Sequence, residues 1–435
     1  MGNVESEEPG PTVVSASAFH YVGFTDHGNK WMIEKEIFIR KLNPLLETLG
    51  EALWSNYAEL KFMSLEQYEM IIKRLTARSD HVSFFLSLLN PHELTVNDIL
   101  VALSWFKLGE TVDSELNSAM SKPVLSSLHA PYTVEDVSRR LSTLYPNLAD
   151  DLTKTTAYAL INGEFPMITL RITNNFTILL NHDIYWLLSV VLDPPYKRPC
   201  ETILNHVAPL ELEQLGHLHC LYDSVSNGCS ITKIKELAFD YEGPLIMLLR
   251  TDRDLFCLVS DQGLRDSMKT YGTENSKLYR FLPEFAKLVS GRSAKLAGPG
   301  VECGIIYSNL TAKTIRRGLL VGHQPLVSPA IEINEGFTEL IYAGGVPLKL
   351  LSVEIWAAGS SEHLKKLQEQ RAFDNKMVDK EKNRKIKVDA DWKDSPDRIL
   401  LNLAGVGGSH SVNLPPEQRE NGDTREPCPQ PDPGS

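Results

Sequence analysis

The sequence predicts an α+β protein in which an N-terminal α-helical domain precedes an antiparallel β-sandwich flanked by helices and a C-terminal helix. Three changes of pattern support this prediction. Apolar residues recur at helical steps between about residues 30 and 160, and short apolar runs separated by turn residues follow from about residue 165. A densely charged stretch begins at Ser361. Helices and strands segregated along the chain are typical of the α+β class.

Composition limits the number of domains and the class of protein. The chain has 435 residues, enough for two or three domains. Its hydrophobic fraction of 42% and charged fraction of 23% are ordinary for a soluble globular protein. A net charge of -12 argues against general nucleic-acid binding, which needs a concentrated basic footprint. No apolar run approaches the roughly 18 residues that a membrane-spanning helix requires.

The N-terminus carries a lipidation signal. The chain opens MGNVESEE, in which Gly2 followed by Ser6 fits the pattern for N-myristoylation. The acidic residues beside it are repelled by an anionic leaflet, and one myristoyl chain gives only marginal, reversible attachment. Lipidation at Gly2 therefore needs a second contact elsewhere on the molecule. We expect residues 1–25 to form a disordered, myristoylated N-terminus.

Residues 26–160 carry the helical pattern. Apolar positions between Lys30 and Leu60 recur at three- and four-residue steps, with Gly50 punctuating the run. Helix-start signals lie at Ser64 with Gln67, at Thr95, and at Thr133 with Asp136. These short paired helices resemble EF-hands, but neither Asp26–Lys35 nor Asp80–Asp98 supplies the required series of oxygen ligands. The pattern fits degenerate EF-hand-like pairs that pack without chelating, or an ordinary helical bundle.

Residues 165–359 carry the β pattern. Strands are expected at Met167–Ile172 and Phe176–Leu180, whereas Asn181–Leu192 fits either a strand or a helix. Further strands are expected at Leu218–Tyr222, Pro244–Arg250, Leu255–Ser260, Leu278–Leu282, Gly304–Tyr307, Gly318–Val321, Ala330–Ile333 and Leu348–Trp356. Ile231–Leu237 predicts a helix against them. Many short strands separated by turn residues indicate an antiparallel sandwich.

Residues 361–404 form the predicted C-terminal helical segment, and residues 405–435 a disordered tail. The helix from Ser361 through about Lys387 has a sparse apolar edge. Its basic residues gather at Lys380, Lys382, Arg384, Lys385 and Lys387. Each such residue near an anionic leaflet is worth about 1 kcal/mol, so this patch would supply the second membrane signal. Because acidic residues are interspersed, a docking face for a protein partner or a merely solvated face fits as well.

No constellation of residues predicts catalysis, a metal or a cofactor. His217 and His219 alternate along an expected strand, but no further zinc ligands cluster with them in the sequence. There is no nucleophile-elbow motif, and the six cysteines include no C-x-x-C pair. A redox-sensing thiol at Cys229, Cys257 or Cys303 would need an electropositive, partly exposed setting. Cys257 follows Phe256 in an apolar run, which indicates an inert core thiol, and Cys303 has the acidic neighbour Glu302.

A series of motifs in the β-rich part resembles the TLDc domain. In chain order they are Cys220–Ser224 with Gly228 and Ser230, Gly243–Asp252, Tyr271–Thr273, Leu278–Pro283 and Val353–Gly359. The resemblance extends to the mTOR-associated, EAK-type (enhancer of Akt-null) members through the N-terminal start, Leu49–Leu53, Ser64–Tyr68, and Val388–Asp391 with Gly408–Ser411. The chain departs from the family pattern at Cys257–Val259 and Gly318–Gly322.

The resemblance implies a non-enzymatic regulatory protein without a cofactor. It implies nutrient or insulin-like signalling of the mTOR, Akt and FoxO type, and binding to a membrane-associated complex such as the vacuolar proton ATPase (V-ATPase) or an mTOR-type complex. We expect the protein on the cytoplasmic face of the plasma membrane or lysosome, and in the cytoplasm. The alternative is an oxidative-stress-resistance protein with a reactive thiol or weak enzymatic activity in the TLDc domain. A calcium-responsive helical domain is a third possibility.

Overall fold

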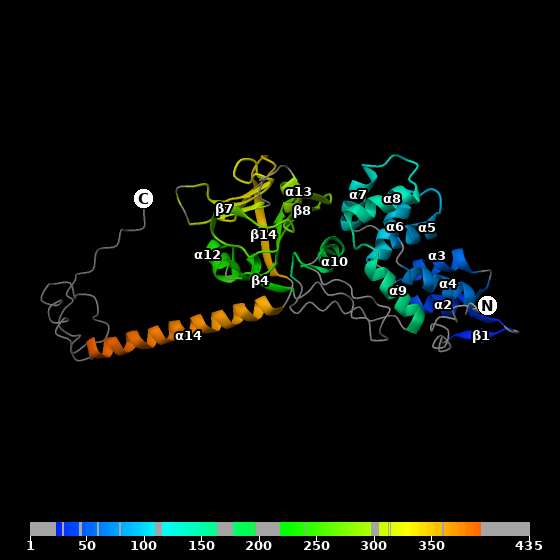
Figure 1. Cartoon of the computed structure of the whole chain (residues 1–435), viewed down its shortest axis with the longest axis horizontal. Coiled ribbons are helices and arrows are strands. Elements are labelled where there is room, and N and C mark those ends of the chain that lie inside the picture. The colour runs from blue at the N-terminus through cyan, green and yellow to red at the C-terminus, as the bar shows by residue number, and fades with distance from the viewer. Residues whose placement is uncertain are drawn as a thin grey trace, which may run out of the picture. The chain divides into compact units, whose positions relative to one another are not determined.

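The structure is a computed structural model (Figure 1). It describes residues 23–27, 30–42, 46–58, 61–77, 80–108, 115–162, 177–193, 195–196, 218–239, 241–296, 304–311, 313, 315–358 and 361–392, the last ten by their backbone only. The chain divides into two compact units, Met1–Leu367 and Gln368–Ser435. Within the described ranges, no helix combines the length and the apolar character needed to cross a bilayer.

The N-terminal part is helical, as predicted. Its helices are α2 (Lys35–Leu42), α3 (Glu47–Tyr57), α4 (Leu65–Thr76), α5 (His81–Leu89), α6 (Val96–Phe106), α7 (Glu115–Leu125), α8 (Val134–Leu144) and α9 (Asp150–Asn162). The predicted helix starts are confirmed, because Ser64, Thr95 and Thr133 cap α4, α6 and α8. The expectation that Gly50 punctuates the first run is wrong, since Gly50 is buried inside α3.

Short antiparallel contacts join the loops of this helical region in pairs. The strands β1 (Phe24–Asp26), β2 (Trp31–Glu34) and β3 (Phe62–Ser64) form a small sheet in which Ile33 lies opposite Met63. A second contact joins the loops before α6 and α8, where the Leu94 N–H donates to the Tyr132 carbonyl at 2.8 Å. Helices paired through their loops favour the EF-hand-like arrangement over a plain bundle.

The rest of unit 1 contains a large antiparallel sheet. Its strands are β4 (His219–Asp223), β5 (Leu245–Thr251), β6 (Leu255–Ser260), β7 (Ser267–Tyr271), β8 (Lys277–Leu282), β9 (Ala286–Ser290), β10 (Ile306–Asn309), β11 (Gly318–Val321), β12 (Ile331–Ile333), β13 (Glu339–Tyr342) and β14 (Leu348–Ala357). Their order is β7-β10-β11-β12-β13-β14-β5-β6-β8-β9, and β4 also pairs with β14. The start of β14 pairs with β13, its residues from Leu350 onward pair with β5, and its end also pairs with β4, so this strand belongs to two layers.

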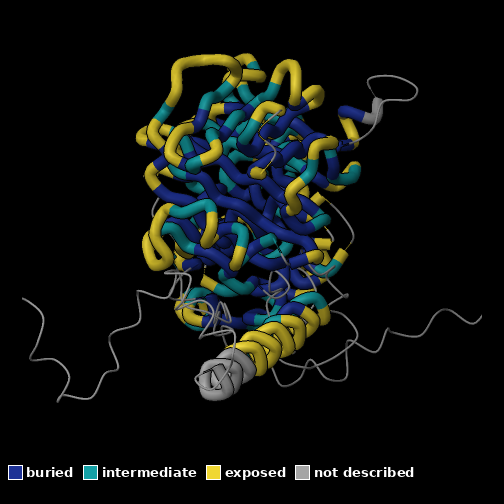
Figure 2. The backbone as a smooth tube through the Cα atoms, turned by 90° about the vertical axis from the view of Figure 1, so that its left-hand side faces the viewer, coloured by how far each residue is buried: buried dark blue, intermediate teal, exposed yellow. Residues whose placement is uncertain are grey.

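The two layers enclose one hydrophobic interior, and the predicted sandwich is confirmed. Met247 and Leu258 from one layer share a buried cluster with Leu319 and Ile331 from the other. The tube in Figure 2 is correspondingly dark along these central strands. Successive side chains of a strand point to opposite faces, which explains how the interior is filled from both sheets.

The outer face of one layer is also covered. Ile246 on β5 and Trp356 on β14 belong to a second buried cluster, which they share with the N-terminal helices and with α10 (His182–Val191). Because β5 is packed on both faces, nearly all of its residues are buried. The segment for which the sequence allowed a strand or a helix is therefore the helix α10.

Several sequence-based expectations need correction. The strand expected at Phe176–Leu180 is wrong in its described part, because the Thr177 N–H donates to the Leu180 carbonyl at 3.3 Å and closes a turn. Met167–Ile172 lies outside the described residues. The helix expected at Ile231–Leu237 is α12 (Ile231–Ile234) followed by a π-helical turn, η3 (Lys235–Phe239). Two short helices, α11 (Ser224–Asn227) and α13 (Gly291–Leu296), were not predicted.

The two strands at the ends of the sheet order are short, and each carries a lysine. β7 and β9 have five residues each, and the exposed side chains of Lys269 and Lys287 lie on them. Each pairs with its neighbour through an irregular register. The sequence pattern missed both strands, together with β13, because none of them carries a clear apolar run.

Candidate functional site

The predicted C-terminal helix is confirmed as α14 (Ser361–Trp392), which follows closely on β14. Its first two turns are part of the sandwich. Leu367 is only 4% exposed and belongs to the interior cluster, and Leu364 packs against the same cluster. The base of α14 is therefore held by hydrophobic packing.

Tyr241 also contacts the chain at the start of α14. Its hydroxyl donates to the Ala358 carbonyl at 3.0 Å, and its ring lies edge-on to His363 with centroids 6.2 Å apart. A Cβ atom at Gly243 would lie 2.5 Å from the Tyr241 hydroxyl and 2.8 Å from the His363 ring. Any larger residue at position 243 would force Tyr241 or His363 to move, so the chain packs tightly against the start of α14 at this point. We call Tyr241, Gly243, His363, Leu364 and Leu367 the helix socket.

Beyond Leu367 the residues of α14 whose burial is described are nearly all exposed, and the tube is yellow there (Figure 2). Three of them are large and apolar: Phe373 is 63% exposed, Met377 44% and Val378 48%. Phe373 and Met377 are four residues apart and so share one face of the helix. Exposed apolar side chains at this spacing are the anchors that an amphipathic helix places in a partner's groove.

The predicted basic patch lies on the same helix. Lys380 and Lys382 are exposed. Arg384, Lys385 and Lys387 continue the helix. Asp379 and Glu381 alternate with the lysines and are exposed as well. This part of α14 thus mixes both signs of charge with exposed apolar side chains. Gly2, the predicted lipidation site, lies outside the described residues.

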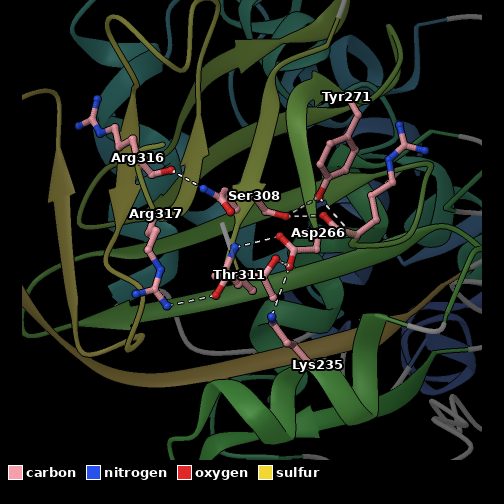
Figure 3. Close-up of polar contacts among 10 residues, drawn as sticks. Lys235, Asp266, Tyr271, Ser308, Thr311, Arg316 and Arg317 are labelled. Atoms are coloured by element: carbon pink, nitrogen blue, oxygen red, sulfur yellow. Dashed lines mark hydrogen bonds and ion pairs between the residues drawn. The ribbon is translucent and has the colours of Figure 1, made fainter. Parts of the chain in front are cut away.

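A polar network outside the predicted site residues is centred on Asp266 (Figure 3). Its carboxylate accepts hydrogen bonds from the Leu310 N–H at 2.9 Å, from Lys235 Nζ at 3.3 Å and from the Thr311 hydroxyl. Burial acts to raise the pKa of Asp266, but the hydrogen bonds from Thr311, Leu310 and Lys235 together hold that pKa below its usual value. The network joins η3 to the start of β7 and the end of β10.

Two arginines near this network are paired with carboxylates. Arg316 makes two contacts with Glu332, and Arg317 lies 2.6 Å from Glu335. Sequence reasoning missed these residues and Asp266, because their partners come from distant strands. No local motif signals such pairs.

Two of the described thiols, Cys220 and Cys257, lack the setting of a redox sensor. Burial, with Glu354 nearby, raises the pKa of Cys220 to about 12. Cys257 is fully buried, and burial raises its pKa further. Cys229 is exposed, and its Sγ donates to the Phe337 carbonyl at 3.2 Å. Cys303 lies outside the described residues. Both buried thiols stay protonated at neutral pH, and a thiol reacts as its thiolate.

Metal ligands do not gather in the described part of the chain. No group of three His, Cys, Asp or Glu side chains that could hold an ion occurs there. His219 lies on β4, and His217 falls outside the described residues.

In the loops before α4, α6 and α8, the side chains at the position of the last calcium ligand take part in helix capping. In an EF-hand, the last ligand of the loop is a carboxylate near the start of the following helix. In α6 the corresponding residue, Asp98, accepts the N–H of its own N-cap Thr95 at 2.7 Å. Gln67 in α4 does the same for Ser64 at 2.8 Å, and Asp136 in α8 accepts from the Thr133 hydroxyl at 2.9 Å. These side chains are turned toward their N-caps, which argues against calcium binding.

Comparison with known proteins supports one family assignment. No curated protein matches the chain. The family model of the TLDc domain matches residues 201–388, a range that contains all strands of the sandwich and most of α14. Together with the antiparallel sandwich, this match identifies residues 201–388 of the chain as a TLDc domain.

Proposed function

We propose that the chain is a non-enzymatic regulatory protein of the TLDc class that binds a membrane-associated complex through α14. The observation that carries this proposal is the exposed face of Phe373 and Met377 on a helix whose base is fixed in the socket. A helix held at one end presents its free face without a large ordering cost on binding.

The partner and the pathway come from the EAK-type resemblance. We propose the V-ATPase or an mTOR-type complex as the partner, in nutrient or insulin-like signalling on the lysosomal or plasma membrane. Myristate at Gly2 would add membrane affinity that is too weak to suffice alone. Attachment would then depend jointly on the acyl chain and on the contacts of α14.

A substitution on the exposed face of α14 tests the docking role. Phe373→Asp with Met377→Asp should reduce capture of V-ATPase subunits from lysates in mild detergent by at least about tenfold, because two apolar anchors are lost. Val346→Asp is the matched control, since Val346 is 79% exposed in the loop between β13 and β14. Capture by the double variant at the control level would refute docking through α14.

The lipid contribution is tested separately. Gly2→Ala should shift the protein from the membrane to the soluble fraction, whereas Asn3→Ala, which leaves the motif intact, should not. Unchanged partition of the Gly2 variant would exclude the acyl anchor. Neutralising Lys380 and Lys382 should have little effect on binding to vesicles containing phosphatidylserine if α14 contacts a protein.

The antioxidant alternative makes an opposite prediction for the thiols. If it were correct, one cysteine should react with iodoacetamide far faster than free thiol at pH 7. We expect Cys220 and Cys257 to react much more slowly than that, because burial keeps both protonated.

A further inference from the structure

On the outer face of the layer formed by β5 and β14, the carboxylate of Glu354 is buried, and its hydrogen-bond partners within the described ranges are all neutral. Glu354 on β14 is 0% exposed, and all four of its hydrogen bonds in the structure come from neutral donors. The donors are the Thr177 hydroxyl at 2.6 Å, the N–H groups of Leu179 at 3.0 Å and Leu180 at 3.2 Å, and Trp356 Nε1 at 3.1 Å. Burying a carboxylate is costly unless such bonds are made.

Three of the four donors belong to one turn outside the matched TLDc range. Thr177 holds this turn together, because its hydroxyl also accepts the Leu180 N–H at 3.1 Å. Asn181 follows directly and caps α10 through the Ile184 N–H at 2.9 Å. Glu354 therefore places its negative charge at the N-terminal end of α10, where the helix dipole favours an anion.

The same helix is fastened to the N-terminal helical region. Lys107, which follows α6, lies 3.0 Å from Asp183, and Trp186 Nε1 donates to the Phe106 carbonyl at 3.0 Å. At the other end of α10, the Asn147 N–H donates to the Val190 carbonyl at 3.2 Å. α10 is thus bound by the sheet through Glu354 and by the helical region through Lys107 and Asn147.

We propose that Glu354 is the latch that couples the helical region to the TLDc domain. The face of the sheet around Trp356 is the docking surface for α10. The Glu354 carboxylate fixes α10 on this surface by accepting hydrogen bonds from the turn before the helix. It follows that the TLDc structural unit starts at Thr177, well before the matched range. This inference does not rest on the proposed function, and Glu354 is a positioning residue.

Removing the carboxylate should separate the two regions. Glu354→Ala removes the acceptor of all four donors. Three of them, the Thr177 hydroxyl, the Leu179 N–H and Trp356 Nε1, lose the acceptor described above, whereas the Leu180 N–H still donates to the Thr177 hydroxyl. In the full chain, amide exchange in α10 should become at least about tenfold faster than in the wild type, while exchange in β11 and β12 stays unchanged. Thermal unfolding should change from one transition to two, because the shared cluster no longer links both parts.

Two milder variants test the same contact if Glu354→Ala does not fold. Thr177→Val removes one donor at constant shape, and Glu354→Gln keeps one acceptor oxygen; both should accelerate exchange in α10 selectively, by a smaller factor. Glu339→Ala on β13, an exposed glutamate of the same sheet, is the control and should change neither measurement. Uniformly faster exchange in all strands, with a single lowered transition, would mean a purely structural role and would overturn the latch.

Discussion

Asp266 shows how one side chain can join segments that are far apart in sequence. Its donors come from η3 and from the end of β10. Asp266→Asn should destabilise the protein at pH 7. The folded pKa lies below the unfolded value of 3.8, so the charged form contributes stability above that value and the contribution is lost as pH falls through the folded pKa.

The expected result for Asp266→Asn is therefore a difference in urea midpoint that is full at pH 7 and shrinks below about pH 4. Asp252→Asn, in the turn between β5 and β6, provides the control. A difference that stays constant down to pH 3 would show that geometry, not charge, makes this residue important.

Lys41 provides a second residue whose charge state matters. It is buried on α2, its Nζ lies 3.2 Å from the Tyr68 hydroxyl, and burial lowers its pKa to about 8. Since the unfolded state binds this proton more tightly, wild-type stability should rise relative to Lys41→Met as pH increases from about 8 to 10.5. A difference in unfolding free energy between the two proteins that stays constant across this pH range would contradict a lowered pKa for Lys41.

At the scale of elements, the capping pairs stabilise the helical region without calcium. Thr95→Ala removes the N-cap hydroxyl of α6 and should lower the free energy of unfolding by about 1 kcal/mol. Added calcium should leave the urea midpoint of the wild type unchanged, because Asp98 is committed to the cap. A midpoint that rises with calcium concentration would show that the loops open to bind the ion.

The elements that the sequence predicted are those whose signals are local. The caps at Ser64, Thr95 and Thr133 and the apolar runs of β5, β6 and β11 depend on neighbouring residues alone. β7 and β9 escaped prediction because edge strands need no apolar alternation. From the sequence, α10 could be either a strand or a helix, because its apolar residues lie on all sides. The turn that leads into its cap is held by Glu354, far along the chain.

At the scale of the whole molecule, the two halves of α14 should be separable. A chain ending after Leu367 keeps the socket filled and should unfold at the wild-type temperature, while losing capture of the partner that we propose for α14. A chain ending before Ser361 also removes Leu364 and Leu367 and should be less stable by roughly 2–5 kcal/mol, the usual cost of an emptied leucine site. Equal stability of the two truncated chains, measured by calorimetry, would argue against the socket.

The candidate site was only partly predictable. The lipidation motif at Gly2 and the basic residues from Lys380 onward are visible as short sequence patterns. The socket is not visible as a sequence pattern. Tyr241 and Gly243 become neighbours of His363 only in the folded chain, where β14 places the start of α14 against the sandwich. The latch at Glu354 was missed for the same reason, since three of its four donors lie more than a hundred residues upstream.

The ends of the sheet have a consequence for behaviour at high concentration. β7 and β9 are brief, irregularly paired and lysine-bearing, so a neighbouring molecule would find little regular backbone to extend and would have to bury an ammonium group. The protein should therefore resist fibrillar stacking even in concentrated solution, and any self-association should proceed through side chains instead.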